Sequence, residues 1–238
     1  MAETVQAIRC EKITKVFGNV VANDQIDLDV RYRETLALLG ENGRGKTTVM
    51  NMLAGIYFPD ECEIFVNGSP VTIASPKDAF ACGIGMIHQH FKLVDVFTAA
   101  ENIVLGLEDE GKLDLKAASA KIVDICQKYG FSIDPSKKVY DMSVSEKQTV
   151  EIVKVLYRGA DILILDEPTA VLTPQETDKL FAVLRSMRDD GKAIVIITHK
   201  MHEVEELSDR VAILRHGQFV GDMLTSMTNA QEMTNMMV

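Results

Sequence analysis

The stretch GENGRGKTT, residues 40–48, decides the fold of this chain. It stands directly after the apolar run TLALL (residues 35–39) and directly before VMNMLAG (residues 49–55). An unbroken apolar run is typical of a strand buried on both faces, and the residues from Lys46 to Ala54, closed by Gly55, predict a helix. A glycine-rich turn between a buried strand and a helix predicts a phosphate-binding loop.

The glycines and the lysine of this loop fit the spacing G-x-x-x-x-G-K-[ST]. Glycine lets backbone N–H groups close around phosphate oxygens, and the helix N-terminus adds about half a positive charge. Lys46 is expected to reach the terminal phosphates and Thr47 to bind Mg²⁺. Arg44 occupies a variable position, where a solvent-pointing side chain is favoured over a phosphate or partner contact. The residues of the loop predicted to bind a nucleotide are Gly40, Asn42, Gly43, Gly45, Lys46, Thr47 and Thr48.

A second acidic position is expected at the end of another strand, in ILILDE (residues 162–167). Asp166 would complete the Mg²⁺ shell, and Glu167 would orient or deprotonate an attacking water. Alternatively, Asp166 is an exposed turn carboxylate, or Glu167 is an acid near a helix N-terminus before Pro168. Together the loop and the acids predict a P-loop NTPase, or a kinase that transfers phosphate to a small molecule.

Composition narrows the class of protein. A chain of 238 residues, 47% of them hydrophobic, can form one large domain or a core with a subdomain. The formal charge of −10 and the absence of Trp argue against a nucleic-acid partner. The first residues lack the apolar core of a secretory signal, and no stretch approaches a membrane span. The four scattered cysteines predict reduced thiols rather than disulfides or a zinc site.

Apolar patterning predicts an α/β fold with a mostly parallel sheet. Continuous apolar runs at 35–39, 161–165, 192–198 and 210–214 are typical of strands covered by helices on both faces. By contrast, IDLDV (residues 26–30) alternates as a half-solvated antiparallel strand does.

Helices are expected between these strands, and they dominate the middle of the chain. The predicted ranges are Gln175–Arg188, Met201–Leu207 and, within a helical insertion, residues 114–130. We therefore predict one domain over residues 1–238, made of three parts. These are residues 1–90 with the antiparallel strands and the phosphate loop, a helical subdomain over 91–158, and the remainder of the core over 159–238.

The block MSVSEKQTVEIVKVLYRGADILILDEPTAVLTPQE (residues 142–176) resembles the signature-to-Walker-B block of ATP-binding cassette (ABC) proteins. In addition, ITHKMHEV (residues 197–204) is similar to the switch-histidine segment of that family, and GIGMIHQHF (residues 83–91) to its Q-loop. The motifs occur in the family's order and cover essentially the whole chain. The resemblance implies the ABC ATPase fold, with a RecA-like P-loop core, an antiparallel β subdomain and a helical subdomain, and it implies ATP and Mg²⁺ as ligands.

The resemblance also implies roles for the matching residues. Glu167, His199 and Gln89 would be catalytic, and Thr47, Gln89 and Asp166 would hold Mg²⁺. His199 taken alone could instead be a satisfied core or cap histidine. A metal site at the neighbours of Gln89, His88 and His90, is disfavoured, because adjacent strand residues face opposite sides and no carboxylate or Cys cluster accompanies them.

Three further residues match binding positions of the family. Phe17 would stack on adenine, although it could also be a core residue. Ser143 and Ser145 would contact the γ-phosphate held by a second cassette, although Ser143-x-x-Glu146 is also an ordinary capping box.

The signature departs from the pattern of the subfamily that the chain resembles most. That pattern reads roughly Leu-Ser-Val-Gly-Glu-Gln-Gln-Arg, whereas this chain has MSVSEKQT (residues 142–149). A serine at position 145 would cost about 1–2 kcal/mol if the backbone there needed positive φ. Thr173 stands where many relatives have an Asp that couples the two sites, but the subfamily resembled here often lacks that Asp too, so Thr173 indicates the branch and not a loss of function. We therefore predict that the cassette's own site is complete, and that the opposite site, completed by this signature, is slower or only structural.

That subfamily comprises the ATPases of simple-sugar and nucleoside importers, which usually carry two cassettes in tandem. The resemblance implies an ATPase that drives import from the cytoplasmic face of the membrane. The implied partners are a second cassette, transmembrane permease subunits and, indirectly, an extracytoplasmic solute-binding protein. The helical insertion, with FKLVDVF (residues 91–97), would be the docking surface. We predict that the chain is the first cassette of a longer polypeptide; the alternatives are a non-transport cassette ATPase and a small-molecule kinase.

Overall fold

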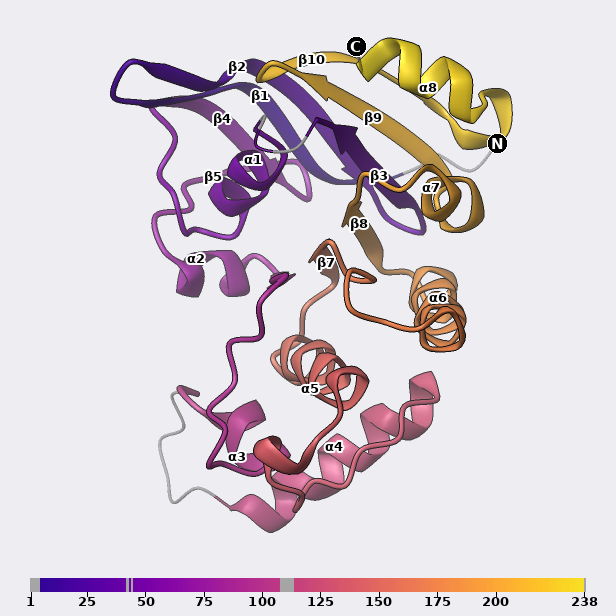
Figure 1. Cartoon of the computed structure of the whole chain (residues 1–238). Helices are drawn as coiled ribbons and strands as arrows, with labels where there is room; N and C mark the ends of the chain where they lie inside the picture. The colour runs from indigo at the N-terminus through magenta and orange to yellow at the C-terminus, as the bar shows by residue number, and fades with distance from the viewer. Residues whose placement is uncertain (1–4, 42, 44, 108–113, 238) are drawn as a thin grey trace.

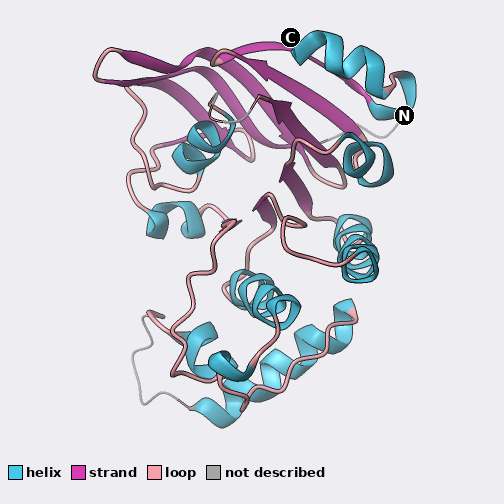
Figure 2. Ribbon diagram, viewed as in Figure 1, coloured by secondary structure: helices cyan, strands magenta, loops and turns pink. Residues whose placement is uncertain are grey.

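The computed structural model describes residues 5–41, 43, 45–107 and 114–237 (Figure 1). Two sheets and several helices make up one part of the molecule, and a part formed only of helices and loops lies at the other end (Figure 2).

The smaller sheet is antiparallel and has the strand order β2-β1-β4-β5. Alternate residues of β2, Ile26, Leu28 and Val30, are buried, so IDLDV is the half-buried antiparallel strand that its pattern predicts. The strands of this sheet are β1 (Gln6–Phe17), β2 (Val20–Arg31), β4 (Glu61–Val66) and β5 (Ser69–Val71).

The larger sheet carries the phosphate loop and has the order β10-β9-β3-β8-β7-β6. Its strands run parallel except β10, which pairs antiparallel with β9 at one edge. Every residue of β3, β7 and β8 is buried, which confirms the prediction made from the unbroken apolar runs. Its strands are β3 (Thr35–Gly40), β6 (Ile84–Ile87), β7 (Ile162–Asp166), β8 (Ala193–Ile197), β9 (Arg210–Arg215) and β10 (Gln218–Leu224).

The helices follow the start and stop signals of the sequence closely. The last turn of α4 ends at Gly130, whose φ of 78° is the left-handed conformation that glycine adopts readily. The helices are α1 (Lys46–Leu53), α2 (Pro76–Ala81), α3 (Ala99–Val104), α4 (Leu115–Tyr129), α5 (Val144–Tyr157), α6 (Pro174–Asp189), α7 (Met201–Leu207) and α8 (Ala230–Met237); short 3₁₀ turns lie at Val139–Asp141 and Thr225–Met227.

The helical end of the molecule has a hydrophobic cluster of its own. Helices α3, α4 and α5 pack there around Ile103, Ile122, Val150 and Val153, all of which are buried. These helices lie within the region 91–158 that the sequence marks as a helical insertion.

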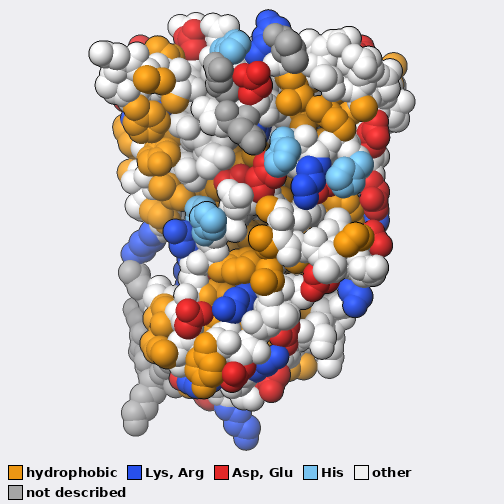
Figure 3. Space-filling model, viewed as in Figure 1, with side chains coloured by type: hydrophobic (Ala, Val, Ile, Leu, Met, Phe, Trp, Pro, Cys, Tyr) orange, Lys and Arg blue, Asp and Glu red, His pale blue; other side chains and the backbone are white. Residues whose placement is uncertain are grey.

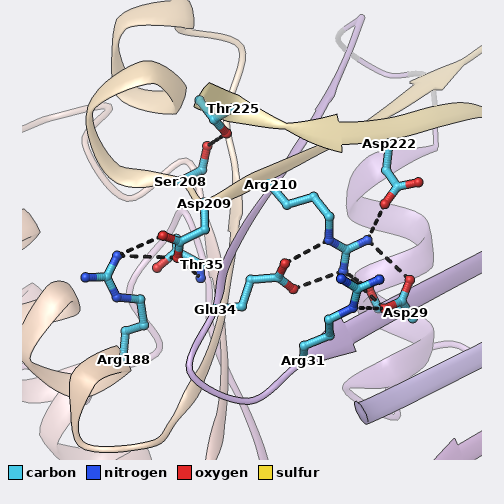
Figure 4. Close-up of polar contacts among 10 residues, drawn as sticks. All are labelled: Asp29, Arg31, Glu34, Thr35, Arg188, Ser208, Asp209, Arg210, Asp222 and Thr225. Carbon is cyan, nitrogen blue, oxygen red and sulfur yellow. Dashed lines mark hydrogen bonds and ion pairs between the residues drawn. The ribbon is translucent and has the colours of Figure 1, made fainter. Parts of the chain in front are cut away.

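A buried guanidinium joins the two sheets (Figure 4). Arg210 of β9 is 3% exposed and donates to both carboxylate oxygens of Glu34, at 2.8 and 3.0 Å. It also donates to Asp29 of β2, at 3.2 Å to Oδ1 and 2.8 Å to the backbone oxygen, and to Asp222 of β10. Burial alone would lower the pKa of Arg210, but the hydrogen bonds to Glu34 and Asp222 outweigh it and raise that pKa. The guanidinium therefore stays charged and fixes the antiparallel sheet against the edge of the larger sheet.

Candidate functional site

The phosphate loop leaves β3 at Gly40 and enters α1 at Gly45, and only glycine fits at these two places. A Cβ on Gly45 would lie 2.5 Å from the backbone oxygen of Ala22, and one on Gly40 would lie 2.3 Å from that of Leu214. Gly45 also has a φ of 96°. The buried side chain of Asn23 donates to the carbonyl oxygen of Gly45 at 3.1 Å, so β2 supports the loop from behind.

Lys46 lies inside the loop and is only 5% exposed. Its Nζ donates to the backbone oxygens of Gly40, at 2.6 Å, and of Glu41, at 2.9 Å. Burial lowers the pKa of this lysine, while Glu167 and Asp166 act in the opposite direction. The loop, with its ammonium group and backbone N–H groups, is therefore suited to hold several negative oxygens. Asn42 and Arg44, both considered in the sequence prediction, lie outside the described residues.

A cavity of about 300 Å³ opens beside the loop. On one wall, Oγ1 of Thr47 lies 3.5 Å from Oδ1 of Asp166, the last residue of β7. Asp166 is 7% exposed, so the alternative of an exposed turn carboxylate is wrong. Burial raises the pKa of Asp166, as does the nearby Glu167. The cavity is lined by Gly43, Gly45, Lys46, Thr47, Thr48, Gln89, Asp166, Glu167, Ile197 and His199.

Glu167 and His199 form a pair across this cavity. Nδ1 of His199 lies 2.8 Å from Oε1 of Glu167, and the backbone N–H of Glu167 donates to Ile197 at 2.9 Å. The second carboxylate oxygen of Glu167, Oε2, is buried and has no hydrogen-bond partner among the described residues. Glu167 has a φ of 48°, which is uncommon outside glycine and frequent at functional sites.

Two of the alternatives raised by the sequence fail for this pair. The N-cap of α6 is Thr173, in a capping box with Glu176, so Glu167 is not the acid at that helix start. His199 is not a core histidine, because its side chain is 47% exposed. A view of the surface shows histidine, acidic and basic side chains gathered across the middle of one face of the molecule (Figure 3).

Gln89 lines the same cavity, but it does not lie on a strand. Strand β6 ends at Ile87, so His88, Gln89 and His90 belong to the loop that follows. The argument that His88 and His90 face opposite sides of a strand is therefore wrong. Among the described residues there is nevertheless no group of three or more His, Cys, Asp or Glu side chains placed to hold a metal ion.

Phe17 ends β1 and is 43% exposed, so the alternative that it belongs to the core is wrong. Its ring makes an edge contact with Tyr57, with centroids 5.4 Å apart and planes inclined by 74°. Lys15 places its Nζ 5.4 Å from the centroid of the same ring. Phe17 is not among the residues that line the 300 Å³ cavity.

Ser143 and Ser145 lie at the start of α5, away from the cavity. Ser143 is the N-cap in a capping box with Glu146, and its Oγ lies 3.2 Å from that of Ser145. Ser145 is not among the residues with positive φ, so the strain that a serine would suffer there does not arise. Capping accounts for the local contacts of Ser143, whose hydroxyl is nonetheless exposed at a helix N-terminus.

Sequence reasoning missed several residues that hold the site together. Asn23 supports Gly45, and Gln148, which is 5% exposed, donates to the backbone oxygen of Pro168 at 2.6 Å. Glu203 on α7 is buried beside Thr169 and Thr198. No local pattern marks these polar residues as buried, because most of their partners are 20 or more residues away in the sequence.

Comparison with known proteins identifies relatives of this arrangement. Residues 23–170 match the sequence model of the family described as "ABC transporter". The chain is 47% identical over 99% of its length to the nucleoside import ATP-binding protein NupA of Lactococcus lactis, covering 47% of that protein. It is 44% identical over 97% of its length to the glucose import ATP-binding protein TsgD13 of Haloferax volcanii, covering 48% of it. The chain thus spans about half the length of the curated relatives it matches.

A solved structure shares the fold. The ATP-binding cassette MJ0796, seen as a dimer in a post-hydrolysis state with ADP and Pi, superposes with a TM-score of 0.78. The match covers 92% of this chain and 98% of that one at 21% sequence identity. This likeness confirms the predicted fold class, a mostly parallel α/β core with an antiparallel sheet and a helical part.

Proposed function

This chain belongs to the ABC transporter family, and from that premise we propose that it binds and hydrolyses ATP to power an importer for a simple sugar or a nucleoside. The observation that carries the proposal is the Glu167–His199 pair, held at 2.8 Å in the cavity beside the phosphate loop. The names of the curated relatives, which import nucleosides or glucose, support the class of solute.

In this proposal the loop and Lys46 bind the phosphates of ATP, and Phe17 stacks on the adenine. The residues around Thr47 fit a magnesium ion, because its hydroxyl, the carboxylate of Asp166 and the amide oxygen of Gln89 are the hard oxygen ligands that Mg²⁺ prefers. The raised pKa of Asp166 also fits, since a buried carboxylate is stabilised in its ionised form by a cation beside it. When bound, Mg²⁺ would neutralise charge on the phosphate oxygens.

Glu167 and His199 would act on the attacking water and on the γ-phosphate, respectively. An ionised carboxylate only accepts hydrogen bonds, so Nδ1 of His199 carries the proton that it shares with Oε1 of Glu167. This contact orients the carboxylate of Glu167, which would accept a proton from the attacking water. The other ring nitrogen of His199 would donate to the γ-phosphate, where negative charge accumulates.

Ser143 and Ser145 do not line this chain's own cavity. We infer that they serve the γ-phosphate of a second cassette, and that the second cassette lies in the other half of the full polypeptide. The dimer formed by MJ0796 and the doubled length of the curated relatives support this inference. The chain's own residues supply a complete catalytic set, whereas the site completed by residues 143–148 is expected to be slower.

The remaining partners follow from the proposed transport. We infer that the helical part, residues 91–158, docks permease subunits with its segment 91–97, in which Val96 is 64% exposed. A solute-binding protein would act through those subunits, and the cassette would sit at the cytoplasmic face of the membrane. None of the helices within the described ranges is long and apolar enough to cross a bilayer. Residues 1–90 and 159–238 would form the rest of the single domain.

The test is ATP hydrolysis by the full polypeptide reconstituted with its membrane subunits. We expect phosphate release that the solute-loaded binding protein stimulates, with no phosphorylated product. A phosphorylated small molecule would establish a kinase instead. Hydrolysis indifferent to the membrane subunits would establish a non-transport cassette.

A further inference from the structure

A carboxylate outside the predicted site is buried between its two catalytic segments. Glu203, on the first turn of α7, is 1% exposed. Its Oε1 accepts a hydrogen bond from the hydroxyl of Thr169, and its Oε2 accepts one from the hydroxyl of Thr198 at 2.8 Å. Lys200 completes the cluster, with Nζ 3.0 Å from Oε1 of Glu203. The charge is therefore neutralised where it is buried, and both of its oxygens are hydrogen bonded.

The two hydroxyls stand beside the catalytic pair in the sequence. Thr169 follows Glu167 by two residues, and Thr198 directly precedes His199. Lys200 adds further bonds to the same threonines: its Nζ donates to Oγ1 of Thr169 at 3.0 Å, and its backbone N–H donates to Oγ1 of Thr198 at 3.1 Å. Glu203 thus bridges the segment that carries Glu167 to the segment that carries His199.

Strand pairing alone does not hold these two segments together. The last residue pair of the ladder between β7 and β8 is Asp166 with Ile197, and one further backbone bond, from the N–H of Glu167 to the oxygen of Ile197 at 2.9 Å, lies beyond it. Glu167 then adopts its positive φ, a conformation that persists when surrounding contacts enforce it. Beyond the ladder, the chain departs toward α6 on one side and α7 on the other. The Glu203 cluster lies at this point of divergence.

We propose that Glu203 is a positioning residue for hydrolysis, which fixes Glu167 and His199 relative to each other through the hydroxyls of Thr169 and Thr198. The proposal rests on the proposed ATPase function. It predicts a change in turnover rather than in nucleotide affinity, because the phosphate loop is supported separately by Asn23. A displacement of about 1 Å between catalytic groups is enough to lower a rate about 100-fold.

The experiment exchanges each threonine for valine and for serine in the full polypeptide within its transporter complex. Valine keeps the shape and removes the hydroxyl, whereas serine keeps the hydroxyl and removes a methyl group. We expect Thr198→Val and Thr169→Val to lower kcat at least ~10-fold with KM for MgATP changed less than ~3-fold, and the serine variants to keep kcat within ~3-fold of wild type. A role in packing alone would give the reverse order, and that result would overturn the proposal.

A second pair of variants tests the carboxylate itself. Glu203→Gln is expected to lower kcat as the valine variants do, while Glu205→Gln, on the exposed side of the same helix, leaves it unchanged. Adding Thr198→Val to Glu203→Gln should produce no further loss if both act through one bond. Additive losses would contradict the proposal. A wild-type complex that hydrolyses no ATP would refute the proposed function instead, whereas active wild type with equally active valine variants would refute only the role of Glu203.

Discussion

The side-chain amide of Gln148 donates to the backbone oxygen of Pro168 at 2.6 Å. Gln148 lies on α5, five residues after Ser143, and Pro168 directly follows Glu167. The helix whose start is proposed to serve a second cassette is therefore bonded to the loop that carries Glu167, the glutamate proposed to act in hydrolysis. This hydrogen bond joins α5 to that loop directly, and not through the sheet.

Glu167→Gln is expected to abolish most ATP turnover of the full assembly, by about 100-fold or more, because it removes the carboxylate proposed to accept the water's proton. Ser143→Arg should have a smaller effect, because it alters only the site whose signature already departs from the family pattern. Both are measured as phosphate release at saturating MgATP. Comparable losses of turnover in the two variants would count against the prediction that the two ATP sites differ in activity.

Gly45→Ala is expected to prevent nucleotide binding. The added Cβ would meet the backbone oxygen of Ala22 at 2.5 Å, so the loop must change shape to admit it. Gly18→Ala is the matched control, since Gly18 also has positive φ, 59°, but has open space where the Cβ would go. We expect the control to cost about 1 kcal/mol of stability and to leave ATP affinity intact, as measured by calorimetry. Unchanged affinity in Gly45→Ala would refute the close fit.

Arg210→Met is expected to reduce the free energy of unfolding by about 3–5 kcal/mol, because it leaves the buried carboxylate of Glu34 without its cation. Arg31→Met is the control: Arg31 also pairs with Asp29, at 2.7 Å, but its side chain is 34% exposed. Its loss should cost about 0–1 kcal/mol. Chemical denaturation of both variants measures the difference in the free energy of unfolding. Equal losses of stability would argue against Arg210 as the residue that joins the two sheets.

The four thiols should differ in reactivity with a disulfide reagent at pH 8. Burial raises the pKa of Cys126 to about 11 and raises that of Cys10 as well, so neither has an appreciable thiolate fraction at that pH. Cys62 is exposed and Cys82 is half-buried, and desolvation raises the pKa of both. Labelling of Cys62 should be the fastest of the four because its thiol is the most accessible, and it should accelerate as the pH increases. Labelling of Cys10 or Cys126 in the native protein at the rate of Cys62 would contradict the structure.

The sequence predicted the strands at the centre of the larger sheet well, because local patterns of apolar residues determine them. Unbroken apolar runs located β3, β7 and β8, and α7 has the predicted bounds. The edge strand β10 escaped prediction, because every residue in it is exposed or only partly buried and no apolar face develops. The sequence prediction extended a strand over His88–His90, whereas β6 has only four residues and ends at Ile87.

The residues of the candidate site also fall into those that local patterns predict and those that they do not. Thr47, Asp166, Glu167 and His199 could be named because each follows a recognisable strand or loop, and the structure brings all four to one cavity. Glu203 could not be predicted as a site residue, because nothing in the sequence separates it from its neighbours Glu205 and Glu206, which are exposed. What distinguishes it is the contact with Thr169, which is 34 residues away in the sequence, and such a tertiary contact leaves no trace in the spacing of residues.

The guanidinium of Arg210 also constrains the order in which the protein can assemble on the ribosome. It follows Glu34 by 176 residues and Asp29 by 181, and the strands that flank β3, namely β8 and β9, belong to the last fifth of the chain. The nascent N-terminal segment therefore emerges with its acids unneutralised and its most apolar strand without neighbours. Contacts so distant in sequence form late, and the exposed strand is then a target for chaperones.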